Sequence, residues 1–311
     1  MWFKNLRLYR LTKDFSLTAE QLAEQLAQFQ FQPCSSYEKS RIGWVSPLPD
    51  TDPEVEPPLA HGVGEYILIC AQAQDRLLPA SVVREYTEEK VAELEQRQAR
   101  KIYRKEKREI AEDMEAQLLP QAFTRNQQIY AYLAPKAGLL VVNAASAPRA
   151  EELVSLLRDS LGSFPVALPE SKRSPSDVMT HWLRDQKASD KFALDEDCEL
   201  FNPMDGSNVI RCKGQDLASD EIVAHLEAGK QVKSLGVSWN NLLSCNIGDD
   251  LVVKRLRFEE MQEDTEQSQD ISPAQKLDQE FALMSLELAN FFQALFAAFG
   301  GLAEPRSQES G

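Results

Sequence analysis

The sequence predicts an α+β fold with mixed or antiparallel sheets, helices packed on them, and a helical segment inserted between two strands. Two pairs of strand-like stretches, 128–133 with 138–143 and 244–247 with 251–257, are close enough to form hairpins. Residues 81–119 contain no Gly or Pro and are rich in Ala, Glu, Gln, Lys and Arg, which is typical of helix. The hairpins favour antiparallel pairing over a parallel sheet.

In the first half of the chain, the sequence predicts alternating strands and helices. Residues 2–12 are expected to form a strand, and SLTAEQLAEQLAQF (16–29) an amphipathic helix capped by Ser16. The Pro- and acid-rich stretch 47–58 predicts an exposed loop. The other elements expected here are strands at 65–72, 128–133 and 138–146 and a helix at 147–162 ending at Gly162.

The helical segment 81–119 is expected to fold back on itself. A straight helix of about 38 residues would extend roughly 57 Å and would not return to the sheet that strands 65–72 and 128–133 share. We therefore expect a two-helix arm with a break near Tyr103–Glu106. The basic stretch RQARKIYRKEKR (97–108) would lie at its tip.

The second half begins with an expected linker at 164–177. The elements predicted after it are a helix at 176–185, a strand near 208–214, a helix at 219–230, two or three strands within 231–258, and a final helix capped by Ser272 with Pro273 at its first position and Gly300–Gly301 after its end. The predicted domains are a central α+β domain in two parts (1–76 and 118–166), the inserted arm (77–117), a C-terminal α+β base domain (167–303) and a flexible tail (304–311).

Composition favours a cytoplasmic protein without a metal or other cofactor. The N-terminus lacks a signal-peptide pattern, and the final helix carries Glu287, Asn290 and Gln293, which makes it too amphipathic for a membrane span. The five cysteines are scattered, which predicts reduced thiols. Phosphate-loop, dinucleotide, hydrolase and zinc-protease motifs are absent, and the carboxylates at 195–197 and 259–264 are expected in solvated loops. The sequence therefore predicts a protein that is not an enzyme.

Charge is concentrated locally, although the formal net charge is −15. Residues 258–311 hold 11 acidic and 2 basic residues, whereas 97–108 hold seven Lys/Arg and one acid. On a helix, Arg97, Lys101, Arg104 and Arg108 would form one positive stripe. Either this stripe binds phosphates or protein, or it is a solvated face held by pairs such as Glu93–Arg97 and Arg108–Glu112.

A second basic group follows in the C-terminal half, where nucleic-acid binding and simple solvent exposure are again both open. In a regular strand, KRLR would place Lys254 and Leu256 on one face and Arg255 and Arg257 on the other. The final helix has a wide apolar face suited to a core or to a subunit interface. That face carries Leu277, Phe281, Met284, Leu288, Phe291, Leu295 and Phe299, with Phe292 and Phe296 beside them.

Several blocks in order carry a family resemblance: WFKNLRLYRL (2–11), LLPQAF (118–123), VIRCKGQDL (209–217), HLEAGK (225–230) and KRLRF (254–258). With these blocks the chain resembles the RdgC family of bacterial recombination-associated proteins. The resemblance implies a ring-forming homodimer that binds duplex DNA, and single-stranded DNA more weakly, without sequence preference. It also implies a nucleoid protein that limits access of the RecA recombinase and supports replication restart.

The resemblance assigns roles at matching positions. Phe123 matches an aromatic residue of a dimer contact, and Gln215, Lys230 and Arg100 match residues linked to DNA, whereas Gly214 replaces a family lysine. The alternative is a regulator that binds recombinase directly through the helical arm. The expected DNA-binding residues are Arg97, Arg100, Lys101, Arg104, Lys213, Gln215, Lys230, Lys233, Lys254 and Arg255, and the expected dimer contacts are Phe123, Phe291, Phe292 and Phe296.

Overall fold

A computed structural model describes residues 2–49, 57–259 and 272–304. In these residues twelve strands form one sheet in the order β2-β4-β5-β6-β1-β12-β11-β10-β8-β9, with β3 beside β4 and β7 beside β1. The pairings between named strands are antiparallel, so the predicted α+β class is confirmed. The predicted domain boundaries remain a prediction.

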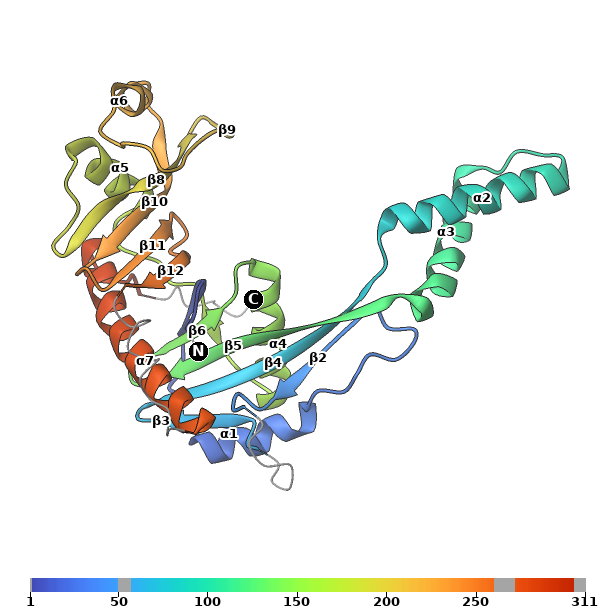
Figure 1. Ribbon diagram of the computed structural model, residues 1–311, viewed down its shortest axis with the longest axis horizontal. Helices are drawn as coiled ribbons and strands as arrows, with labels where there is room; N and C mark the ends of the chain where they lie inside the picture. Colours follow the sequence, from blue (N-terminus) through green and yellow to red (C-terminus); the bar gives the residue numbers. More distant parts are fainter. Residues whose placement is uncertain (1, 50–56, 260–271, 305–311) are drawn as a thin grey trace.

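The ribbon is curved (Figure 1). A helical hairpin made of α2 and α3 projects on one side from the ends of β4 and β5, and α5, α6 and the strands β8–β12, here called the C-terminal sheet, rise on the other side. The N-terminal elements are β1 (Leu6–Leu11), α1 (Ala19–Leu26), β2 (Ser40–Val45), β3 (Ala60–Val63), β4 (Tyr66–Leu77), α2 (Ala80–Gln98), α3 (Arg104–Leu118), β5 (Phe123–Ala134), β6 (Leu139–Asn143), α4 (Ala147–Leu161) and β7 (Val166–Ala167). The C-terminal elements are α5 (Pro175–Asp185), β8 (Phe192–Asn202), β9 (Asp205–Cys212), α6 (Asp220–Glu227), β10 (Gln231–Trp239), β11 (Leu243–Gly248), β12 (Val253–Phe258) and α7 (Pro273–Ala298).

Strands β4 and β5 are each twelve residues long, well beyond the predicted segments. Most pairs between their outer halves, from Gln72↔Gln128 to Leu77↔Phe123, are polar or exposed, and Ala73 is the buried apolar exception. A polar stretch lacks the alternation of apolar and polar residues that predicts a strand, so the sequence predicted only the inner part of each strand. The Leu77↔Phe123 pair also confirms that the helical segment between them returns to its starting point.

The helical segment breaks between Gln98 and Arg104, slightly before the predicted position. Ala99 ends α2 in the left-handed conformation with φ 51°. The expected single positive stripe is therefore wrong, because Arg97 lies on α2 whereas Arg104 and Arg108 lie on α3.

Other sequence-based boundaries also needed correction. Helix α1 begins after Thr18 rather than Ser16, because Thr18 and Gln21 form a reciprocal capping box. The carboxylates at 195–197 lie in β8 and not in a loop, since Cys198 and Leu200 anchor this strand in the core. The predicted linker 164–177 contains β7, which pairs with β1 through Arg10↔Ala167. Most of the predicted loop 47–58 lies outside the described residues.

Two apolar clusters form the core. One joins α7 to the C-terminal sheet and to residues such as Phe3 and Tyr132, and the other joins α1 and α4 to β2, β4 and β6. Helix α7 starts with the expected Ser272 cap, completed by Gln275, and has Pro273 at its first position. By length and composition α7 could cross a membrane, a test that core helices also pass. Its Phe281, Met284 and Leu288 are buried against the sheet.

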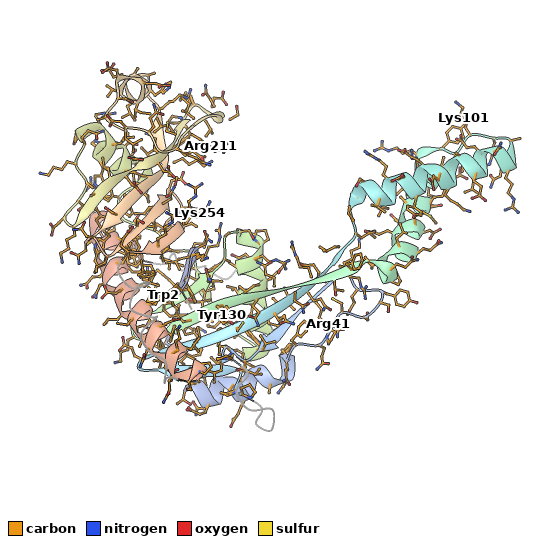
Figure 2. The ribbon with its side chains drawn as sticks, viewed as in Figure 1. Trp2, Arg41, Lys101, Tyr130, Arg211 and Lys254 are labelled. Atoms are coloured by element: carbon orange, nitrogen blue, oxygen red, sulfur yellow. The ribbon has the colours of Figure 1, made fainter. Side chains whose placement is uncertain are left out.

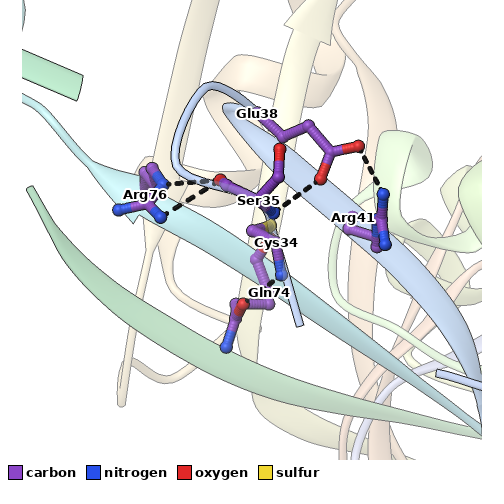
Figure 3. Close-up of polar contacts among 6 residues, drawn as sticks. All are labelled: Cys34, Ser35, Glu38, Arg41, Gln74 and Arg76. Atoms are coloured by element: carbon purple, nitrogen blue, oxygen red, sulfur yellow. Dashed lines mark hydrogen bonds and ion pairs between the residues drawn. The ribbon is translucent and has the colours of Figure 1, made fainter. Parts of the chain in front are cut away.

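A polar loop braces the outer part of β4 (Figure 3). The backbone N–H of Cys34 donates to Oε1 of Gln74 at 2.7 Å, and Nε and Nη2 of Arg76 donate to the Ser35 carbonyl at 3.3 and 3.1 Å. Nη1 of Arg76 also donates to the carbonyls of Leu119 and Ala122, just before β5. One guanidinium thus joins this loop to the base of the helical hairpin.

Candidate nucleic-acid interface

The C-terminal sheet carries a polar pocket of about 340 Å³ on which basic side chains converge. Five Lys/Arg line it, and they come from β9, β10 and β12 or from the residue that follows β9: Arg211, Lys213, Lys233, Lys254 and Arg255. Figure 2 places Arg211 and Lys254 on the side of this sheet that faces the helical hairpin. We call this surface the basic pocket.

A β-bulge brings Lys254 and Arg255 to the same pocket. Between the pairs Ser244↔Arg257 and Asn246↔Lys254, β11 advances by two residues and β12 by three. Arg255 takes the left-handed conformation with φ 53°. The strict alternation predicted for KRLR is therefore wrong at this point, although Leu256 is buried as an alternating strand requires.

Acidic neighbours neutralise part of the basic pocket. Glu199 pairs with Arg211 at 2.8 Å and with Lys233 at 3.7 Å, and Asp197 pairs with Arg255 at 2.6 Å. Within the described parts of the chain, neither Lys213 nor Lys254 has an ion-pair partner. These two lysines are consequently the most available for an external anion.

Asp249 adds a titratable group to the same wall. Burial, together with the nearby carboxylate of Asp250, raises its pKa, while Lys233 acts in the opposite direction. Its backbone N–H donates to the Lys233 carbonyl at 2.8 Å, which holds the two chain segments together. The net charge of the pocket therefore changes with pH when Asp249 loses its proton, which happens at a higher pH than for an ordinary aspartate.

Gln215 and Lys230 do not line the basic pocket. Nζ of Lys230 donates to Oδ1 of Asn208 on β9 at 2.6 Å, and Nε2 of Gln215 donates to Glu221 on α6 at 3.2 Å. Gly214 lies between the pocket and Gln215 with φ 57°, a conformation that favours glycine. Its N–H donates to Oδ1 of Asp197 at 3.1 Å.

The basic residues of the helical hairpin form a separate group. Lys101 lies at its far end (Figure 2), and Arg100 makes two hydrogen bonds with Glu106 at 2.7 and 2.8 Å. The expected Arg108–Glu112 pair is present at 2.9 Å, but Glu93 pairs with Lys90 rather than Arg97. The two basic groups lie at opposite ends of the curved chain (Figure 1).

A groove of about 510 Å³ runs between α2 and α3. Leu78, Val83 and Ala111 contribute apolar surface to it, and Arg104 and Arg108 line it as well. Phe123, close to the base of this hairpin, is 84% exposed, so most of its ring faces solvent among the described residues.

Of the other expected dimer contacts, Phe291 and Phe292 lie inside the chain and Phe296 is partly buried. Phe291 and Phe292 are 0% and 4% exposed, because α7 lays its aromatic face on the sheet, and they leave no surface for a second subunit. Phe296 is partly buried and stacks on Phe292 with ring centroids 6.2 Å apart. The apolar face of α7 is thus mainly core, and the interface expectation is corrected for Phe291 and Phe292.

The chain's carboxylates do not gather into a recognisable metal centre in the described residues, where no group of three or more His, Cys, Asp or Glu could hold an ion. Glu259 accepts a hydrogen bond from Ser244 at 3.0 Å, and Asp264 lies outside the described residues.

Arg211 is not among the expected DNA-binding residues. Its spacing of two from Lys213 within the strand predicted near 208–214 was the available signal, since alternate residues of a strand share a face.

The chain is similar to known proteins over nearly its whole length. A protein-family model described as "Putative exonuclease, RdgC" matches residues 1–302. The chain is 44% identical over 302 residues to the "Recombination-associated protein RdgC" of Aeromonas hydrophila, covering 97% of this chain and 98% of that protein. It is 42% identical over 307 residues to the protein of that name from Pseudomonas putida (strain GB-1), covering 98% and 99% respectively. The Pseudomonas aeruginosa (strain LESB58) protein of that name is 42% identical over 310 residues.

Proposed function

This chain belongs to the RdgC family, and we propose on that premise that it binds duplex DNA without sequence preference through the basic pocket. The observation that carries the proposal is the convergence of five Lys/Arg on one face of an otherwise acidic chain. Contacts from Lys and Arg to phosphates give affinity and position without reading the base sequence. Single-stranded DNA offers fewer phosphates to the same face and would bind more weakly.

Individual contacts in this pocket would be weak, because Asp197 and Glu199 compete with phosphate for three of the five cations. A protein with weak contacts gains retention by enclosing its ligand, since the bound molecule then cannot diffuse away. We propose that two curved copies join into a ring around the duplex. The exposed ring of Phe123 supports a contact near the helical hairpin, because a large apolar side chain there faces solvent.

The proposed ring would occupy duplex that a RecA-type recombinase would otherwise use, which fits the name of the relatives, recombination-associated protein. The protein would then be cytoplasmic and located with the nucleoid. In this proposal the helical hairpin, with Arg97, Arg100, Lys101 and Arg104, either lines the ring or closes it.

Retention on closed circular and linear duplex after a high-salt wash tests the proposal. The ring predicts that circular DNA retains the protein whereas linear DNA loses it from its ends. In a low-salt binding assay, Lys213→Ala combined with Lys254→Ala should lower affinity, and Lys276→Ala, on the exposed start of α7, serves as the matched control. Equal loss from both DNA forms would contradict encirclement, and an unaffected double variant would contradict the pocket.

A second candidate function is direct regulation of a protein partner through the helical hairpin. The groove between α2 and α3 favours it, because an apolar floor with basic sides suits an acidic, partly apolar peptide. A complex with recombinase that forms without DNA and resists added salt would support this function over DNA binding.

The family description also contains the word exonuclease. Incubation of end-labelled duplex with the protein and Mg²⁺ addresses this directly. Nucleotide release that disappears in Glu259→Gln would establish nuclease chemistry and replace the non-enzymatic proposal.

A further inference from the structure

Two cysteines face each other across the base of the β8–β9 hairpin. Cys198 on β8 is the direct cross-strand partner of Cys212 on β9, so both side chains project from the same face of the sheet. Directly opposed residues in antiparallel strands have Cα atoms about 4.5–5.5 Å apart. Disulfides usually span Cα separations of about 4.4–6.8 Å, so the backbone already has the spacing that a disulfide needs.

The surroundings shield this pair from solvent. Both cysteines are free thiols and are buried in the apolar core of the C-terminal sheet. Their chain neighbours Glu199 and Arg211 line the basic pocket, and successive side chains of a strand point to opposite faces, so a reagent reaches the thiols only when these strands open locally. Cys34 and Cys245 are not cross-strand partners of another cysteine, and Cys70 pairs with Val45 and Tyr130. Cys198 and Cys212 are therefore the pair that the sheet itself places in register.

We propose that Cys198 and Cys212 form a reversible disulfide when local opening of these strands exposes them to a low-molecular-weight disulfide. One protein thiolate attacks the reagent's S–S bond, forming a mixed disulfide and releasing one small thiol. The second protein thiolate then attacks the protein sulfur of that mixed disulfide and displaces the second small thiol. The protein loses two protons and two electrons, and the reagent's S–S bond is reduced to two thiols.

The reaction is slow at neutral pH and speeds up in alkali. Burial, and then the neighbouring Cys212 thiol, raise the pKa of Cys198 to about 12. The thiolate is the attacking form, and its fraction rises about tenfold for each pH unit below the pKa.

The test uses the full-length protein with bis(2-hydroxyethyl) disulfide, followed by acid quench and intact mass analysis. We expect the loss of two hydrogens, reversal by a reducing agent, and a peptide map that links Cys198 to Cys212. Cys212→Ser should abolish the loss, and Cys34→Ser, the matched control, should retain it. Five thiols still open to alkylation after unfolding, a disulfide that uses Cys34, Cys70 or Cys245, or a rate independent of pH would each overturn the proposal.

An effect on DNA binding follows if the proposed function holds, because Arg211 and Lys213 flank Cys212 and both line the pocket. A disulfide would fix β9 in place and reduce the entropy lost on binding, so the oxidised protein should bind duplex several-fold more tightly. The mass measurement does not depend on DNA. Equal affinity of the two forms would refute this effect alone, whereas loss of DNA binding by both forms would count against the proposed function.

Discussion

Glu199→Gln should strengthen DNA binding, because it releases two cations of the basic pocket. Oε2 of Glu199 lies 2.8 Å from Nε of Arg211, and Oε1 lies 3.7 Å from Nζ of Lys233. A phosphate that binds either cation must compete with this carboxylate. Glutamine keeps the size of the side chain and one acceptor oxygen but removes its charge.

The magnitude follows from the exposure of the two pairs. Arg211 and Lys233 are 67% and 46% exposed, so solvent screens both interactions and each is worth about 0.2–1 kcal/mol. Releasing both therefore favours phosphate by about 1 kcal/mol, which corresponds to roughly fivefold higher affinity. Each added phosphate contact should also steepen the dependence of log affinity on log salt by about 0.9.

Fluorescence anisotropy with a labelled duplex, repeated over a range of salt concentrations, measures both quantities. Glu24→Gln is the matched control, because it makes the same charge change at an exposed position on α1, far from the pocket in sequence and on another element. An unchanged or weaker affinity in Glu199→Gln, or an equal gain in Glu24→Gln, would refute the assignment of DNA to this pocket.

Four further outcomes are expected. Phe291→Ala should lower the free energy of unfolding in urea by about 3–5 kcal/mol, since its ring is fully buried, and a mere loss of dimer would contradict the core placement. Phe123→Ala should leave unfolding within about 0.5 kcal/mol while lowering the dimer fraction in light scattering. Gly43→Ala should cost about 1–3 kcal/mol, because its Cβ would lie 2.5 Å from Cα of Phe31. The pKa of Asp249 is raised, so its charged form is less favourable in the folded chain than in the unfolded chain. The stabilisation given by the protonated carboxyl is present below the unfolded pKa and is lost as pH rises through the folded pKa. Asp249→Asn should therefore raise the melting temperature at pH 7 but not at about pH 3.

The sequence was sufficient where local chemistry dictates local structure. Ser272 with Pro273 marked the start of α7, Gly162 marked the end of α4, and the absence of Gly and Pro marked the two helices of the hairpin. It was insufficient for the outer halves of β4 and β5, because those segments are mostly polar and are held largely by pairing with neighbouring strands, β2 included. Their extent depends on partners distant in sequence.

The same division applies to the candidate site. The residue types alone singled out Lys213, Lys233, Lys254 and Arg255, because clustered Lys and Arg stand out on an acidic chain. Only the tertiary structure brings these four residues into one pocket, through the bulge at Arg255 and the pairing of the strands from β8 to β12. Only the tertiary structure shows that Asp197 and Glu199 form ion pairs with cations of this pocket. It also moved Phe291 and Phe292 from a possible interface into the core. Composition specifies which charges and apolar groups exist, whereas long-range pairing of strands decides which of them meet.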